Sequence, residues 1–297
     1  MISPFSRRML WVLLTLAALQ SGESQAPERP RSNRAPEPKE ATGALLLQAQ
    51  QAFQAGKKTE ALALATKAVE AEPGHPRPYF IRGKIHELMR NGASAISDYD
   101  RVVALDKTAI DIYQFRGAER FKLGQIKEAV EDFDRYLTLR PDQAAHHWQR
   151  GIALYYLDRF EDGRKQFDLH QSVNANDVEN AAWHYLCNAR ATRDPKKAAQ
   201  QILPIQEDGR PSMMDLYALY RGTKSVEEVE SAIRQMPAGE KKDQAEFYGA
   251  LYIGLFYEAQ QDFVKARPQL LKSARLSANF GYMGDVARVH VAKKYTP

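Results

Sequence analysis

Small and aromatic positions recur at a fixed interval between residues 42 and 177. Three Arg-Gly pairs, Arg82-Gly83, Arg116-Gly117 and Arg150-Gly151, follow one another at a constant interval of about 34 residues. In blocks of this length counted from Thr42, the eighth and twentieth positions are small, and the twenty-fourth is aromatic in the last three blocks. These positions are Ala49, Gly83, Gly117 and Gly151; Ala61, Ala95, Ala129 and Gly163; and Ala65, Tyr99, Phe133 and Phe167. The interval predicts four stacked helical hairpins, at 42–75, 76–109, 110–143 and 144–177.

This pattern resembles the tetratricopeptide repeat, or TPR. In that family the small eighth residue of the first helix faces the small twentieth residue of the second, and the aromatic residue packs into the hairpin. The segments Tyr79-x-x-Arg82-Gly83 and Leu139-Arg140-Pro141 follow the family consensus. The resemblance implies an all-α solenoid that presents a curved surface to another protein.

Aspartates accompany two of the repeated arginines at the same interval. Asp98 follows Arg82, and Asp132 follows Arg116. We interpret these residues as a structural ladder of ion pairs, within or between repeats, in preference to a ligand site. Arg150 departs from the pattern because Gln166 stands where the aspartate would be. It could reach Asp132 instead, or point to a ligand.

After residue 177 the repeat weakens. An irregular helical region is expected over 178–246, including a helix after Ser225 with Glu228 completing a capping box. Residues 247–297 predict a fifth TPR-like hairpin and a terminal helix that caps the exposed end of the stack. Gly254, Tyr257, Ala266 and Leu270 take the repeat positions of this hairpin, and Pro268 is expected to kink or shorten its second helix.

The first 26 residues have the order of a secretory signal peptide. Arg7 and Arg8 precede an apolar run from Met9 to Leu19, which is shorter than the roughly 18 residues of a spanning helix. We expect cleavage between Gly22 and Pro27 and an exported, periplasmic or secreted protein. Anchoring by an uncleaved signal is the alternative. Residues 27–41 are rich in proline and charge, and they predict a disordered linker.

The distribution of charge and the single cysteine bear on the possible partners and on covalent attachments. The net charge of +5 is spread along the chain, and no basic block lies beside aromatic residues, so nucleic acid is not an expected partner. Cys187 is the single cysteine. It excludes an intramolecular disulfide, and its position deep in the chain excludes a lipid anchor after the signal.

The sequence offers little for catalysis, and it predicts no metal or cofactor. His146 and His147 are adjacent, so their side chains diverge on a helix, and His184 with Cys187 lacks further ligands nearby. No hydrolase, zinc-protease or phosphate-binding motif is present. We therefore expect a non-catalytic protein. The alternative is an enzyme or enzyme subunit with its site in the insert 178–246.

Positions on the first helix of each hairpin line the concave groove of TPR proteins generally. Here they are aromatic and basic, a combination that suits a peptide with acidic groups. The predicted groove residues are Phe53, Arg77, Phe80, Lys84, Phe121, Lys122, Trp148, Tyr155 and Tyr156, with Leu46, Gln114 and Ile152 beside them. The alternative is that a terminal segment of the chain covers these rings.

A more specific resemblance concerns residues 76–290. The stretch from Trp148 to Tyr156, the Trp183-His184-Tyr185-Leu186 helix and Phe247-Tyr248 resemble the NlpI family of bacterial periplasmic TPR lipoproteins. That resemblance implies an envelope adaptor that forms a homodimer and docks peptidoglycan hydrolases and a tail-specific protease. The chain lacks the family's lipid-bearing cysteine, which puts outer-membrane attachment in doubt.

Overall fold

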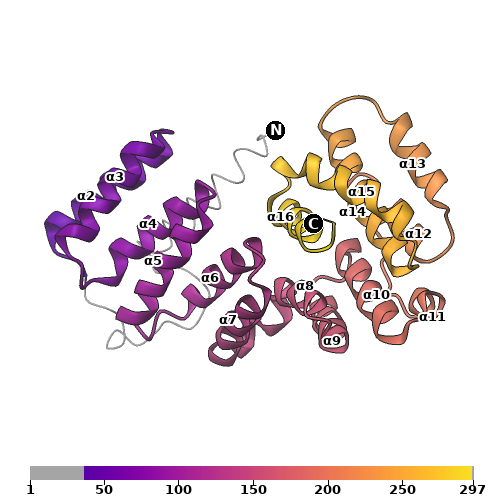
Figure 1. The fold of residues 1–297 in the computed structure, drawn as a ribbon, viewed down its shortest axis with the longest axis horizontal. Coiled ribbons are helices and arrows are strands. Elements are labelled where there is room, and N and C mark those ends of the chain that lie inside the picture. Colours follow the sequence, from indigo (N-terminus) through magenta and orange to yellow (C-terminus); the bar gives the residue numbers. More distant parts are fainter. Residues whose placement is uncertain (1–36, 296–297) are drawn as a thin grey trace. The chain divides into compact units, whose positions relative to one another are not determined.

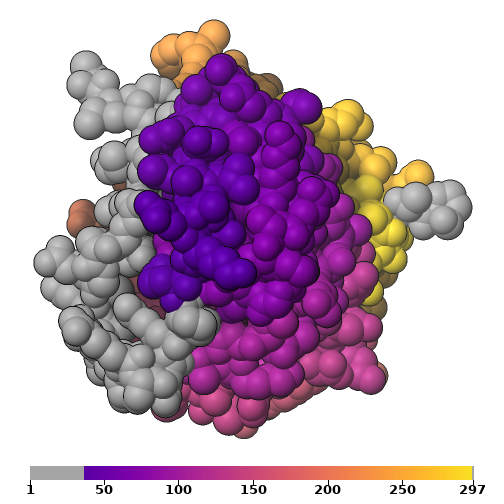
Figure 2. Space-filling view, turned by 90° about the vertical axis from the view of Figure 1, so that its left-hand side faces the viewer, coloured from indigo at the N-terminus to yellow at the C-terminus, as the bar shows by residue number. Residues whose placement is uncertain are grey.

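The structure is a computed structural model that describes residues 37–295. The predicted signal peptide and residues 27–36 of the predicted linker lie outside this range. The chain divides after Pro38, and the second unit, from Lys39, holds the described helices. The described residues form α-helices and short 3-10 helices without any strand, which confirms the all-α prediction. Figure 2 looks onto the N-terminal end of this array, where α2 to α5 form much of the front surface.

Eight helices form the four hairpins expected between residues 42 and 177, and each packs against the next along the chain (Figure 1). A 3-10 helix, η2 (Pro141–His146), separates the third hairpin from the fourth. The helices are α2 (Glu40–Gln54), α3 (Lys58–Ala71), α4 (Pro76–Leu88), α5 (Gly92–Leu105), α6 (Asp111–Lys122), α7 (Ile126–Leu139), α8 (Trp148–Tyr156) and α9 (Phe160–Gln171).

The repeated glycines lie where two helices approach closely. A Cβ atom on Gly117 would come within 2.7 Å of the Phe133 ring and 3.2 Å of the Ala129 carbonyl oxygen. In the same way, a Cβ atom on Gly83 would come within 2.8 Å of the Tyr99 ring, and one on Gly151 within 2.7 Å of the Phe167 ring. The second-helix residues Ala95 and Ala129 are fully buried. These contacts explain why the sequence keeps small residues at a fixed interval.

The ion-pair ladder also has a structural basis. Arg82 donates from Nε and Nη2 to the two carboxylate oxygens of Asp98, at 2.9 and 2.7 Å. Arg116 binds Asp132 in the same way, at 2.9 and 2.6 Å. Arg116 also reaches back to Asp100 of the preceding repeat, at 2.7 Å. Each pair ties the two helices of one hairpin together, and the link to Asp100 ties neighbouring hairpins together.

The region 178–246 continues the array with less regular geometry. The helix α10 (Val178–Thr192) packs against α9, and α11 (Pro195–Gln200), α12 (Met213–Tyr220) and α13 (Val226–Gln235) follow it. The predicted capping box is present, because the Ser225 hydroxyl accepts from the Glu228 amide and the Glu228 carboxylate accepts from the Ser225 amide.

The last hairpin consists of α14 (Glu240–Ala259) and α15 (Phe263–Leu276). Its first helix begins before the predicted start at Phe247. Gly254 meets Leu270 at the close approach, with a hypothetical Cβ only 2.6 Å from the leucine Cγ. The helix α15 continues through Pro268 to Leu276, so the proline does not shorten it.

The chain then turns through η3 (Ser277–Asn279) into α16 (Gly281–Lys294). The predicted terminal helix is therefore present and packs against α15, but it also contacts α6, which is far away in the sequence. In Figure 1, α16 lies on the inner side of the path traced by α4 to α10. A large core cluster consequently runs from α6 to α16, and a smaller cluster holds the first hairpins together.

Candidate interaction surface

The first helices α2, α4, α6 and α8 carry the residues that the sequence assigns to a concave groove. Phe121 of α6 and Tyr156 of α8 meet edge to face, with ring centroids 5.6 Å apart. The repeat register therefore places these rings on one side of the array, as expected. Their exposure to solvent, however, differs from the prediction.

The helix α16 covers the rings of the third and fourth hairpins. Tyr282 stacks on Phe121 with centroids 5.3 Å apart, and it meets Trp148 edge to face at 5.2 Å. Phe121 is fully buried as a result, and Trp148 is half-buried. The C-terminal helix thus occupies the place at which a TPR would receive a peptide from another protein.

A buried polar network holds α16 in this position. The Tyr156 hydroxyl lies 2.9 Å from His290 Nδ1, and His290 Nε2 lies 3.1 Å from Glu258 Oε1. Lys294 and Tyr295 also donate to Glu258, at 3.0 and 2.5 Å. The network joins α8, α14 and α16.

The charges in this network follow from burial and hydrogen bonding. Burial alone would raise the pKa of Glu258, but the bonds from His290, Lys294 and Tyr295 outweigh it and lower the pKa to about 2. Burial lowers the pKa of His290 despite the neighbouring carboxylate. Glu258 is therefore ionised against Lys294, while a neutral His290 donates to Glu258 and accepts from Tyr156.

The prediction that Phe121, Tyr155 and Tyr156 are exposed in an open groove is wrong. Phe121 and Tyr156 are covered by α16, while Tyr155 is 2% exposed because it packs between Phe160 and Trp183. Lys122 is also engaged, in an ion pair with the buried Glu119. In the third and fourth hairpins the alternative interpretation holds, because the C-terminal helix α16 covers the rings.

The predicted residues on α2 and α4 keep partial exposure. Phe53, Arg77, Phe80 and Lys84 are all half-buried. Phe80 lies beside Phe115, with centroids 5.9 Å apart, and the Lys84 ammonium is 4.2 Å from the Phe115 centroid. Lys84 also pairs with Glu87 at 2.8 Å. This aromatic and basic surface on α2, α4 and the start of α6 is the candidate site, which we call the α2–α4 surface.

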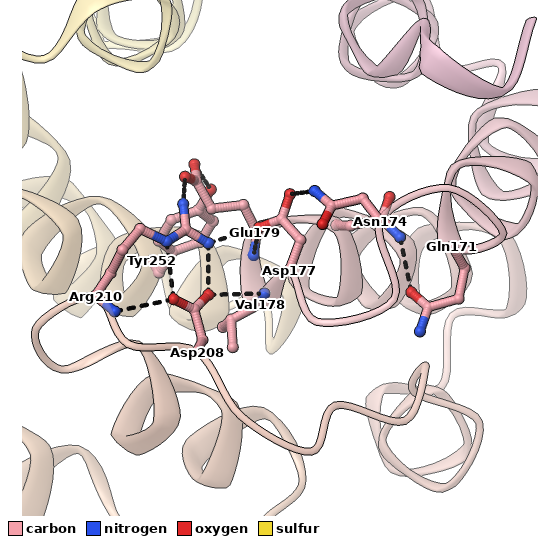
Figure 3. Close-up of polar contacts among 9 residues, drawn as sticks. Gln171, Asn174, Asp177, Val178, Glu179, Asp208, Arg210 and Tyr252 are labelled. Carbon is pink, nitrogen blue, oxygen red and sulfur yellow. Dashed lines mark hydrogen bonds and ion pairs between the residues drawn. The ribbon is translucent and has the colours of Figure 1, made fainter. Parts of the chain in front are cut away.

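The insert contains a dense charged cluster around Arg210 (Figure 3). Arg210 binds Asp177, Glu179 and Asp208, and the Asp208 carboxylate also accepts from the Val178 amide at 3.2 Å. Burial raises the pKa of Glu179 to about 7, with Asp177 adding to the effect and Arg210 opposing it. The cluster fastens the segment before α12 to the start of α10, and its carboxylates are occupied by Arg210 and Tyr252.

Across residues 37–295, no three His, Cys, Asp or Glu side chains are arranged to hold a metal ion. His184 instead lies 3.1 Å from Asp168, and Cys187 is a buried free thiol. Among the helices that the structure describes, none has the length and apolar character needed to cross a membrane.

Sequence reasoning missed the residues of α16 that fill the array, above all Tyr282 and His290, and the buried Glu258 that binds them. The repeat could not reveal them because α16 lies outside its register. One signal was available: Met283, Val286, Ala287 and His290 recur at i, i+3, i+4 and i+7, a spacing typical of a helix that buries one face against other elements.

Comparison with known proteins agrees with the repeats. Residues 46–110 and 116–177 match the tetratricopeptide repeat family, which supports the repeats in this part of the chain. Human RNA polymerase II-associated protein 3 is 36% identical over 90 residues, which cover 30% of this chain and 14% of that protein. The chain thus matches only a small part of the length of this curated relative.

Solved structures extend the likeness in fold. A tetratricopeptide repeat protein from Parabacteroides merdae has a TM-score of 0.55 and 16% identity, over 84% of this chain and 98% of that one. The first TPR of Spaghetti (RPAP3), bound to the HSP90 peptide SRMEEVD, is 33% identical and covers 34% of this chain and 79% of that one, with a TM-score of 0.32. The first of these shows a shared helical-repeat fold; the second score is too low to support a structural argument.

Proposed function

We propose that this chain is a non-catalytic adaptor whose tetratricopeptide repeats hold a segment of a partner protein on the α2–α4 surface. One observation carries the proposal. The chain fills the inner side of its third and fourth hairpins with its own helix α16, whereas Phe53, Phe80 and Lys84 remain partly exposed on the first and second.

The chemistry of the α2–α4 surface favours a peptide with aromatic or aliphatic side chains and acidic groups. Phe80 and Phe115 offer ring faces, and Lys84 is held beside them by Glu87 and by the Phe115 ring. A positioned cation beside aromatic rings binds a carboxylate without losing much side-chain freedom. Concave surfaces of stacked helical repeats commonly bind other proteins.

The test begins with capture of partners on the tagged mature protein, followed by measurement of their affinities. Phe80→Ala should weaken binding about tenfold or more, because a central aromatic is lost from the contact. Phe263→Ala is the control, since Phe263 is an exposed ring on α15. Normal binding by both Phe53→Ala and Phe80→Ala, with unchanged circular dichroism, would place the partner elsewhere.

Trp148 has a different expected role from the one its repeat position suggests. Because Tyr282 covers it, Trp148→Ala should lower thermal stability and leave partner affinity nearly unchanged in the fraction that remains folded. A large loss of affinity at full stability would instead mean that partners displace α16.

We also propose that the protein is exported, periplasmic or secreted, without a lipid anchor. The proposal rests on Arg7, Arg8, the apolar run that follows and the absence of a cysteine beside it. N-terminal sequencing of native protein should find a start between Gly22 and Pro27. An intact Met1 would contradict cleavage and leave the uncleaved anchor, and recovery from the cytosol would contradict export.

By resemblance to the NlpI family, we propose a homodimer whose partners include envelope hydrolases or a protease. Light scattering should give twice the mass of the mature chain. A monomer mass over a wide range of concentration would refute the dimer without affecting the α2–α4 surface.

A further inference from the structure

The ladder of arginine and aspartate changes at the fourth hairpin. Arg116 holds two carboxylates, Asp132 within its own hairpin and Asp100 from the preceding one. Arg150 occupies the equivalent position one repeat later. Its Nε donates to Asp134 of the preceding hairpin at 2.5 Å, as Arg116 donates to Asp100. At the position that corresponds to Asp132, however, Arg150 contacts Gln166, which has no carboxylate. The prediction that Arg150 could pair with Asp132 is therefore wrong, because Arg116 and Arg120 bind that carboxylate.

The amide of Gln166 replaces the missing carboxylate only weakly. Its Oε1 lies 3.3 Å from Arg150 Nη1, compared with 2.6 Å between Arg116 Nη2 and Asp132. Its Nε2 donates to the Ala144 carbonyl at 2.7 Å, which fixes the side chain in this orientation. Among the described residues, Arg150 has one carboxylate partner where Arg116 has two. A guanidinium binds a carboxylate best through two parallel bonds, so Arg150 retains capacity for a second one.

Arg150 opens into a cleft of about 650 Å³ between the third and fourth hairpins. The cleft is formed by α7, η2, α8 and α9, and Figure 1 places α7 and α9 on the outer side of the array, away from α16. Apolar residues and basic residues line it together. They are Leu137, Ala144 and Leu169, and Arg150, Arg159 and Lys165.

The cleft carries a small excess of positive charge. Asp134 and Asp162 also line it, and Asp162 pairs with Arg159 at 2.8 Å. The Arg159 and Asp162 side chains are 43% and 45% exposed, so their pair contributes little and can exchange for another partner. Leu169 is 44% exposed beside these charges. An exposed apolar floor with exchangeable cations at its rim is suited to a chain that carries both apolar and acidic side chains.

We propose that this cleft is a second protein-binding site, which accepts an acidic segment of a partner protein. A carboxylate of the segment binds Arg150 from the cleft, beside Gln166, while an adjacent apolar side chain packs on Leu137 and Leu169. Arg159 and Lys165 attract the segment through charge. The site is independent of the α2–α4 surface, because it uses the opposite side of the hairpins.

The test is selection of peptides from a random display library on the mature protein. The wild-type protein should enrich sequences that have an Asp or Glu next to an aliphatic residue. Gln166→Asp should lower the affinity of the selected peptides at least about tenfold, because the chain then supplies its own carboxylate to Arg150. Arg159→Glu should also weaken them, whereas Lys127→Glu, the same charge change on an exposed part of α7, should not.

Two controls keep the result decisive. The Gln166→Asp protein should retain its cooperative thermal unfolding, since Asp98 and Asp132 occupy the same position in folded hairpins. Phe80→Ala should bind these peptides normally, which separates this site from the α2–α4 surface. The proposal is overturned if acidic peptides are not enriched, or if the enrichment survives both Gln166→Asp and Arg159→Glu. It is also overturned if titration calorimetry shows inorganic phosphate binding as tightly as the selected peptides.

Discussion

The absence of a Cβ atom at the repeated glycines lets the two helices of a hairpin approach closely. Gly117 has no side chain because the Phe133 ring fills the space that a Cβ atom would need. The helices therefore come together closely enough for Arg116 to bind Asp132 across the hairpin. One small residue thus permits both the aromatic contact and the ion pair, and the same relation recurs in the second hairpin between Gly83, Tyr99, Arg82 and Asp98.

Gly117→Ala should destabilise the protein by about 1–3 kcal/mol, because the added methyl group must displace the Phe133 ring. Gly43→Ala is the matched control. Gly43 is also helical, but no heavy atom lies within 4 Å of its hypothetical Cβ. That substitution should be neutral or stabilise the protein by up to about 1 kcal/mol, as alanine favours the helix. Chemical denaturation of the two variants measures the difference, and equal stabilities would contradict the helix pairing.

His147 is a buried cap that depends on being neutral. It precedes α8, and its Nδ1 accepts a hydrogen bond from the Arg150 amide at 3.3 Å. Burial lowers the pKa of His147 to about 4. Protonation would remove the acceptor and place a charge among apolar neighbours such as Phe133, whose ring centroid is 4.7 Å away.

The lowered pKa gives His147 a defined effect on acid stability. Its folded pKa of about 4 lies below the unfolded value of 6.5, so the unfolded chain binds more protons between these limits. The stability that neutral His147 contributes is fully present above pH 6.5. The free energy of unfolding then falls by up to about 3 kcal/mol as the pH drops toward 4. His147→Asn should keep a capping acceptor and flatten the dependence of unfolding free energy on pH over this range. An unchanged slope would mean that His147 does not titrate as described.

At the scale of elements, α16 changes what the array can do. The helix begins after η3 and packs against the last hairpin. It places Tyr282 in contact with both Phe121 and Trp148. Its far end is fixed by the bonds of His290, Lys294 and Tyr295 to Glu258. It is therefore both a cap on the last hairpin and a filler of the concave side.

Tyr282→Ala should lower stability by about 2–3 kcal/mol, because a partly buried ring with two aromatic neighbours is removed. It should also shift the emission of Trp148 to longer wavelength as water reaches the indole. Val264→Ala, at a side chain that is 87% exposed, should change stability by less than about 0.5 kcal/mol. If Tyr282→Ala behaves like this control, α16 does not occupy the position described.

At the scale of the whole helical array, residues 39–295 include a large core and a smaller one toward the N-terminal end. The larger core joins α6 to α16, because α16 links hairpins that are distant in sequence. The smaller core includes Val69, Tyr79, Tyr99 and Ile112 and depends on contacts between sequence neighbours. Stability in a stack of repeats follows such neighbour contacts, so the two ends of this array should differ.

Amide hydrogen exchange should therefore be faster in α2 and α3 than in α10 and α14. Among the described helices, α2 and α3 pack mainly on α4, whereas α10 contacts α8, α9, α11, α12 and α14. Local opening needs less free energy where fewer buried contacts are lost. Mass spectrometry of peptides across the chain measures the gradient. Uniform protection would mean that the array opens as one unit.

The sequence by itself determined the hairpins, because each repeat is held by contacts within itself and with its immediate neighbours. A glycine opposite an aromatic ring, or Arg82 opposite Asp98, leaves a periodic record that can be read without coordinates. Only the tertiary structure decided which concave residues stay exposed. The contact between Phe121 and Tyr282 joins positions that are far apart in the sequence and has no period, so no local pattern records it. The same rings that the repeat places on an open face are covered because burying their apolar area against α16 is favourable, and this leaves α2 and α4 as the partly exposed part of the inner surface.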